Sequence, residues 1–282
     1  MQFIAPHPCT VPAFAGRQCY AYLFDTMTEL ADLAEKHSAY NGSGSDSWAG
    51  GTGPQAVRLC REGDENLARQ SDKLMTEFEN LSLDSTRTRW ADAVSGGAPN
   101  VPAFLAGSPL AMRRRIKDAH AAAPLCVVSD TTISGACTDK HIMDRGSAIL
   151  ALVRLLSASR PVELWTLCAI DYQSRGAGFY LTRIETAPLD LGRAAFALTH
   201  PAFPRRLQYG LGKKLHSFAG HWPFSDYDKS RANLRALIAP YLPHADEILA
   251  LPGAHIDDPI VTDPKAWLAK ALEEFGPQLA AA

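Results

Sequence analysis

Short apolar runs alternate with helical repeats after Pro124, and this alternation constrains the fold more than any other feature. The runs LCVVSD (125–130) and PVELWTLCAI (161–170) have the length of buried strands, and GFYLTRIETA (178–187) follows through a glycine-bearing turn. Between the first two runs, MDRGSAILALVRLLSAS (143–159) carries its apolar residues at helical spacing. Strands that alternate with helices of this length predict an α/β fold, with a parallel or mixed sheet and helices on both faces.

The first 120 residues are less regular. Residues 18–38 predict a strand and then a helix, which Asp25 or Thr26 caps, and residues 54–82 predict two helices split near Gly63. The segment 95–112 is rich in proline and glycine around several apolar residues, and we expect it to pack on the body of the protein. The basic run that follows it, MRRRIK, is expected on a solvated helix face.

The C-terminal half gives a clearer domain prediction. We expect residues 121–282 to form one α/β domain with an insertion at about 201–245, and residues 1–120 to pack on it as a mixed segment of helices and loops. The chain is expected to close with an amphipathic helix that Asp263 caps, that starts at Pro264 and that ends before Gly276.

Composition excludes several classes of protein. The formal net charge of −2 gives no overall signature of nucleic-acid or anionic-membrane binding. No apolar run reaches the roughly 18–20 residues that span a bilayer, and the N-terminus has no basic and apolar leader pattern, so we expect no membrane contact and no secretory signal. The six cysteines form no C-x-x-C pair and are expected to be reduced thiols in a cytoplasm.

Polar residues follow the first apolar run at every second position. Asp130, Thr132 and Ser134 form the pattern D-x-T-x-S between a predicted strand and a predicted helix. A period of two places alternate side chains on the same side, so one carboxylate and two hydroxyls converge. These hard oxygen ligands suit Mg²⁺ or Mn²⁺. The alternative is that Asp130 and Thr132 only bond to backbone donors in the turn.

The motif resembles the metal-ion-dependent adhesion site of von Willebrand factor A domains, and the resemblance covers roughly residues 125–282. It implies a Rossmann-like, doubly wound, mostly parallel sheet and a non-enzymatic binding function. It also implies two further ligands, for which Thr186 and Asp257 are the candidates. The chain departs from that family in its 201–245 insertion and in the end of its fourth strand.

The whole chain also looks like an uncharacterised family of phage-encoded proteins, through SWAGGTGPQAVRLCREG, GGAPNVPAFLAGSPLAM and DRGSAILALVRLL. This resemblance implies a phage origin and action in the bacterial host cytoplasm, and it carries no catalytic residues. The sequence contains no H-E-x-x-H, G-x-S-x-G or phosphate-binding loop motif, so an enzyme is not favoured.

The leading hypothesis is a phage-encoded binding protein that recognises a protein partner at the strand-end face, with a divalent ion as one means of doing so. One alternative is a nucleic-acid-binding accessory protein that uses Arg205, Arg206, Lys213 and Lys214, which lie among aromatic residues. Another is a virion or assembly component in which Trp48 and the NVPAFLAGSP loop form subunit contacts.

Overall fold

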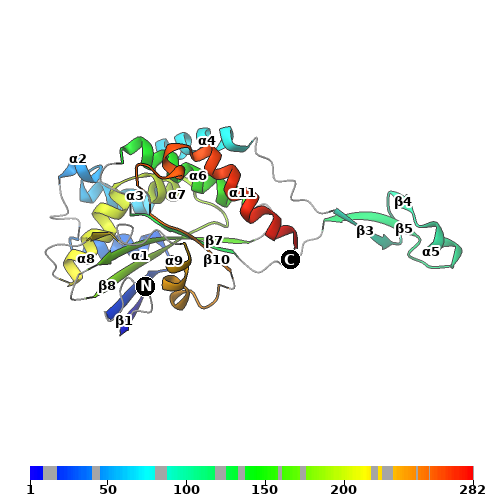
Figure 1. Cartoon of the computed structure of the whole chain (residues 1–282), viewed down its shortest axis with the longest axis horizontal. Coiled ribbons are helices and arrows are strands. Elements are labelled where there is room, and N and C mark those ends of the chain that lie inside the picture. Colours follow the sequence, from blue (N-terminus) through cyan, green and yellow to red (C-terminus); the bar gives the residue numbers. More distant parts are fainter. Residues whose placement is uncertain are drawn as a thin grey trace.

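The predicted strands meet in one sheet at the centre of the protein, whose computed structural model is shown in Figure 1. The structure describes residues 1–8, 18–39, 45–79, 88–117, 125–132, 137–157, 161–171, 176–216, 222–223, 231–245, 247–253 and 255–281. The strands of this sheet are β1 (Gln2–Pro8), β2 (Gln18–Phe24), β6 (Leu125–Asp130), β7 (Val162–Asp171), β8 (Ala177–Ile184), β9 (Trp222–Pro223) and β10 (Glu247–Leu251).

Within the described residues the sheet has seven strands. Six of them follow the order β1-β2-β8-β7-β6-β10, and the seventh, β9, pairs with β7. The pairs β10–β6, β6–β7 and β2–β8 are parallel. The pairs β1–β2, β7–β8 and β7–β9 are antiparallel. Along the six-strand path, parallel pairs therefore outnumber antiparallel ones, and the predicted α/β class is confirmed.

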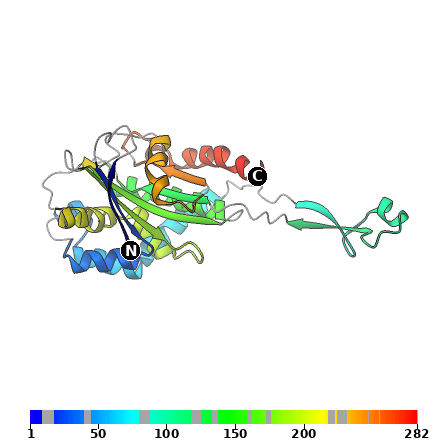
Figure 2. The same cartoon turned by 90° about the horizontal axis from the view of Figure 1, so that it is seen from below.

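Helices cover both faces of the sheet, as Figures 1 and 2 show. Strand β6 illustrates why, because its side chains alternate between the faces. Leu125 and Val127 lie in the larger core, while Cys126 and Val128 lie in the smaller one. The helices of the body are α1 (Met27–Lys36), α2 (Asp46–Ala49), α3 (Gly53–Glu62), α4 (Glu65–Glu79), α6 (Asp139–Ser157), α7 (Leu191–Thr199), the π-helix η3 (Phe203–Gln208), α8 (Tyr209–His216), α9 (Arg231–Ile238), the 3₁₀-helix η5 (Ala239–Tyr241), α10 (Pro259–Thr262) and α11 (Pro264–Ala281).

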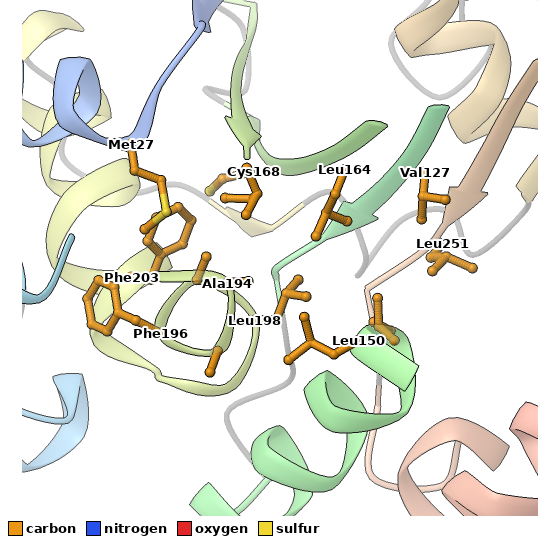
Figure 3. Close-up of a cluster of buried hydrophobic side chains, with 14 of the residues drawn as sticks. Met27, Val127, Leu150, Leu164, Cys168, Ala194, Phe196, Leu198, Phe203 and Leu251 are labelled. Atoms are coloured by element: carbon orange, nitrogen blue, oxygen red, sulfur yellow. The ribbon is translucent and has the colours of Figure 1, made fainter. Parts of the chain in front are cut away.

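The larger core joins the sheet to α1, α3, α6, α7 and α11. Figure 3 shows part of it, where Leu150 of α6 and Leu198 of α7 lie under Val127 and Leu164 of the sheet. Fully burying side chains of this kind contributes about 1.5–3 kcal/mol each. The smaller core, on the other face, packs α9 and η5 against the sheet.

Helices α6 and α7 approach each other closely at Gly146. A Cβ atom at this position would lie 2.5 Å from the carbonyl oxygen of Leu198 and 2.5 Å from Cγ2 of Thr199. Only glycine leaves room for this crossing. The contact fixes the position of α6 over the sheet, and with it the residue next to Gly146, which is Arg145.

The N-terminal residues belong to the same sheet as the C-terminal half. Strand β2 pairs with β8 along its whole length, so the segments 1–120 and 121–282 share one sheet. Strand β1 is one edge of the sheet, contains Pro6 and Pro8, and has a register shift between Ile4 and His7.

Cys19 of β2 is disulfide-bonded, so the prediction of reduced thiols is wrong at this position. Among the described residues, the free cysteines are Cys60, Cys126, Cys137 and Cys168.

Residues 88–117 form an arm that stands out from the body in both Figure 1 and Figure 2. The prediction that residues 95–112 pack on the body is wrong, and so is the predicted helix for MRRRIK, which pairs as a strand with residues 88–93. The arm consists of β3 (Thr88–Ala93), β4 (Ala98–Pro99), α5 (Val101–Leu105) and β5 (Met112–Lys117), with its strands in the order β3-β5-β4.

Several local predictions are confirmed. The hydroxyl of Thr26 accepts a hydrogen bond from the backbone N–H of Glu29 at 3.2 Å and caps α1. The carboxylate of Asp263 caps α11 in the same way, at 3.0 Å from the N–H of Ala266. The predicted end of that helix before Gly276 is wrong, because α11 continues to Ala281.

In the part of the chain that the structure describes, no helix combines the length and apolarity needed to cross a membrane.

Candidate functional site at the carboxyl ends of β6 and β10

The chain reverses its direction of travel across the sheet at β6. From β6 it passes through α6 to β7 and β8 on one side, and it later returns to place β10 on the other side of β6. The two strands are parallel, with Leu251 beside Ser129, so their carboxyl ends lie together. Ligands of open α/β sheets bind at such a switch point, outside the carboxyl ends of the strands. We call this part of the molecule the strand-end face.

Asp130 ends β6 at this face and is only 1% exposed. Its Oδ1 accepts two hydrogen bonds from Thr132, one from the backbone N–H at 2.9 Å and one from the hydroxyl at 2.6 Å. The other carboxylate oxygen, Oδ2, is buried and has no hydrogen-bond partner among the described residues. One carboxylate oxygen therefore shapes the turn, while the other is enclosed in the protein.

Arg145 of α6 brings a guanidinium group to the same place and is also 1% exposed. Its Nη2 donates to the backbone carbonyl of Asp130 at 2.9 Å and to that of Pro252, just after β10, at 3.0 Å. This side chain therefore ties the ends of β6 and β10 together. Its Nε and Nη1 are buried and have no acceptor among the described residues.

Burial dominates the electrostatics of this pair. It raises the pKa of Asp130 from 3.8 to about 6, although the hydrogen bonds from Thr132, the charge of Arg145 and the nearby backbone N–H of Gly253 act against the rise. It also lowers the pKa of Arg145 to about 10, against the charges of Asp130 and Asp258. At neutral pH the two groups are opposite charges buried close together, and they attract each other although the guanidinium bonds to the backbone carbonyl of Asp130 and not to its carboxylate. We call them the buried charge pair, which is costly unless its remaining polar atoms find partners.

The structure separates the predicted metal ligands. Thr186 donates to the carbonyl of Val162 at 2.6 Å, and Val162 lies beside Leu125, at the opposite end of the strands from Asp130. Asp257 lies in the turn after β10, on the strand-end face, with an exposed side chain. Ser134 lies outside the described residues.

The described residues around Asp130 do not fit a divalent ion. The hydroxyl of Thr132 already donates to the carboxylate, and the guanidinium of Arg145 supplies a positive charge beside it. A Mg²⁺ or Mn²⁺ ion instead needs several converging oxygen ligands. No group of three or more acidic, histidine or cysteine side chains able to hold a metal occurs in the described part of the chain.

A groove of about 530 Å³ lies beside the charge pair on the strand-end face. Its apolar lining includes Leu251, Ile260 and Trp267, and its volume lies within the range of about 300–1,000 Å³ of ligand pockets. Its acidic lining residues are Asp258, Asp263 and Glu274, and its basic one is Lys270. Pro252 and Gly253 join the groove to the site, because they also contact Arg145 and Asp130.

The two arginines predicted to contact a nucleic acid, Arg205 and Arg206, instead make contacts within the protein. Arg206 is 3% exposed and donates to the carboxylate of Asp46 at 2.6 Å and to the carbonyl of Gly51 at 2.9 Å. The guanidinium of Arg205 lies 4.5 Å from the centre of the Trp48 ring and also donates to the carbonyl of Trp48. Both arginines therefore hold residues 46–51 on the body, and Arg206 is not available to a nucleic acid.

The other two predicted contacts, Lys213 and Lys214, lie on α8. Lys214 is exposed, whereas Lys213 is half-buried and engaged in an interaction. Only one of the four predicted cations is thus fully presented to solvent, and no continuous basic groove is formed by them.

Sequence reasoning missed Arg145 and the groove. Arg145 lies next to Asp144 and Gly146 at the start of an apolar helix, where it reads as an ordinary charged residue. A usable signal was its position directly before the largely apolar run GSAILALV (146–153), which predicts a buried helix. A charged residue is rarely buried unless it is paired, so Arg145 at the start of this run was a candidate for such a pair.

The fold and the site define an α/β protein with a buried charge pair at the switch point of its sheet and a groove beside that pair. Residues 10–232 match a family described as a domain of unknown function, DUF7192, and the chain belongs to this family. The match includes Asp130, Arg145 and the arm, while β10 and the groove residues follow it. No curated protein and no solved structure matches the chain.

Proposed function

We propose that this is a phage-encoded, non-enzymatic binding protein that recognises a protein partner at the strand-end face and acts in the bacterial host cytoplasm. The observation that carries the proposal is the groove at the switch point, which lies beside the buried charges of Asp130 and Arg145. The apolar groove beside it offers contact area, and the enclosed position of both charges favours binding over chemistry.

The arrangement around the motif supports the proposed likeness to von Willebrand factor A domains. The motif strand β6 is followed by α6, the parallel strand β7 and the antiparallel strand β8, in the sheet order β8-β7-β6-β10. The predicted ligand set does not assemble around Asp130, however, so recognition of the partner is proposed without a metal. Phage origin rests on the likeness of the whole sequence.

The proposal is tested by placing a photoreactive amino acid at Ile256, which is 39% exposed in the turn after β10. The matched control position is Ser157, which is exposed at the end of α6, near the opposite end of the strands. After irradiation of infected host cells, we expect a protein adduct from position 256 and none from position 157.

The outcome that would contradict the proposal is equal labelling from both positions, or no adduct from either. The same experiment is run on lysate with added Mg²⁺ and with EDTA. Adduct formation at position 256 is expected to be the same in both, and loss of the adduct in EDTA would restore the metal hypothesis for Asp130 and Thr132.

A further inference from the structure

The arm ends in an apolar surface that the body does not cover. Val101, Phe104 and Leu105 lie three and four residues apart on α5, a spacing that gathers them on one side of a helix. Phe104 is 70% exposed and Leu105 is 79% exposed. We call these three residues the arm tip. Exposed apolar patches of this kind mark interaction sites.

The arm holds its tip in a defined geometry. Strand β5 pairs with both β3 and β4, and the side-chain amide of Asn100 donates to the carboxylate of Asp92 at 2.8 Å. The backbone N–H of Asn100 also donates to the carbonyl of Ala111 at 2.8 Å, which closes the base of the tip. A tip that is ordered before binding loses less conformational entropy when a partner covers it.

The groove on the strand-end face has the complementary chemistry. Its apolar lining can receive apolar side chains, and its three acidic residues outnumber its one basic residue, Lys270. The arm has the opposite charge, because residues 88–117 contain five basic residues and one acidic residue, Asp92. Arg113 and Arg114, which follow the tip in the chain, are both exposed. Surfaces of opposite charge and matching apolar character favour association.

We infer that the partner recognised at the strand-end face is a second copy of this chain, whose arm tip docks in the groove. This inference rests on the proposed function and identifies its partner. In Figures 1 and 2 the tip lies at the far end of the long axis from its own body. The contact joins two different surfaces, so association is head-to-tail and produces either a closed ring or an open chain of copies.

The basic arm would also suit a nucleic acid or an anionic membrane. The second copy is favoured because the chain itself carries a groove with both the apolar lining and the acidic charge that the arm requires. The test therefore includes the other two occupants as outcomes that overturn the inference.

The test uses two variants of the full chain in sedimentation velocity over a range of protein concentrations. Leu105→Asp removes an exposed apolar side chain from the tip and leaves the groove intact. Ala266→Arg places a long cation in the groove at a position that is exposed, so the fold is retained. The wild type is expected to self-associate, and each variant is expected to do so at least about tenfold more weakly, or about 1.4 kcal/mol.

A mixture of the two variants gives the decisive result. The arm of the Ala266→Arg chain can still enter the groove of the Leu105→Asp chain, so the mixture is expected to form a heterodimer although each variant alone associates only weakly. Lys270→Glu is expected to strengthen association in low salt. The controls are Ser95→Asp, which adds the same charge at an exposed arm position and is expected to weaken association far less than Leu105→Asp, and Ala266→Ser, which is expected to behave as wild type.

A wild type that stays monomeric at all concentrations overturns the inference, and so does a mixture that forms no heterodimer. The inference is also overturned if the chain stays monomeric and binds a DNA duplex or anionic vesicles, and if this binding is lost in Leu105→Asp. The outcomes for the proposed function and for this inference can be told apart. If position 256 crosslinks specifically to a different protein, the proposed function is supported and the second-copy inference is contradicted.

Discussion

The strand-end site and the arm tip reverse the usual distribution of polar and apolar side chains. At the strand ends two charged groups are buried, and at the arm tip three apolar side chains face solvent. Both arrangements are unfavourable in an isolated chain, because a buried charge loses its hydration and an exposed apolar group gains nothing from folding. At the arm tip a partner can supply the missing interactions, whereas at the strand ends the charged atoms are enclosed and a partner reaches only the groove beside them.

Breaking the buried pair should give the largest effect. Replacing Arg145 by leucine leaves the carboxylate of Asp130 buried without its counter-charge and separates the ends of β6 and β10. We expect the free energy of unfolding to fall by about 3–5 kcal/mol, measured by urea denaturation. The control is Arg154→Leu on the same helix as Arg145, because the exposed pair of Arg154 with Asp72 of α4 is worth at most about 1 kcal/mol. Equal losses in the two variants would show that Arg145 does not act through the buried pair.

A matched leucine truncation compares the body directly with the arm. Leu150→Ala empties a fully buried position in the larger core and is expected to cost about 2–5 kcal/mol. Leu105→Ala removes the same atoms from the arm tip and is expected to change the free energy of unfolding by no more than about 0.5 kcal/mol in dilute monomer. Thermal unfolding of the two variants measures the contrast, and a large loss for Leu105→Ala would show that the tip is packed.

The pH dependence of stability isolates Asp130. Its pKa is raised by burial, so the folded chain binds a proton more tightly than the unfolded chain, and stability falls as pH rises from about 4 to about 6. The contribution is about 3 kcal/mol over this window, since one pKa unit corresponds to about 1.4 kcal/mol. The difference in unfolding free energy between wild type and Asp130→Asn should show this fall. A difference that is constant with pH would mean that the carboxyl is not buried.

Removing the arm should give the smallest effect on the body. Replacing residues 88–117 by a short glycine-serine linker removes no member of either core. We expect the unfolding free energy of the body to change by no more than about 0.5 kcal/mol, measured by denaturation of dilute monomer. The same variant should fail to self-associate, so stability and assembly separate in one protein. A substantial loss of stability would place the arm within the cooperative unit.

The alternation of strands and helices after Pro124 was sufficient to predict the class of fold and most of its elements. The continuous apolar run of β6 and the helical spacing in α6 are properties of local sequence, and the caps at Thr26 and Asp263 follow from side chains close to the backbone they bond. The pairing of β2 with β8 joins residues about 160 positions apart, and no local pattern specifies it.

Only part of the candidate site could be predicted, because local sequence specifies only the residues that adjoin a strand end. Asp130 and Thr132 were found because they adjoin a strand end, whereas Arg145 and Pro252 reach the site through tertiary structure. Thr186 was assigned to the site from its order in the chain alone, and the antiparallel course of β8 takes it to the other end. The arm was mistaken for a packed loop because its apolar residues suggest burial, which in this chain would require another molecule.

The edge strand β1 has features that protect copies of this chain from aggregation. An exposed edge strand invites pairing with the edge of another sheet, which leads to disordered growth. In β1 the residues Pro6 and Pro8 have no N–H to offer, and the register shift bends the strand between Ile4 and His7. Edge-to-edge addition along β1 is thereby disfavoured by covalent structure, so ordered growth on this side of the sheet has to proceed through side-chain contacts.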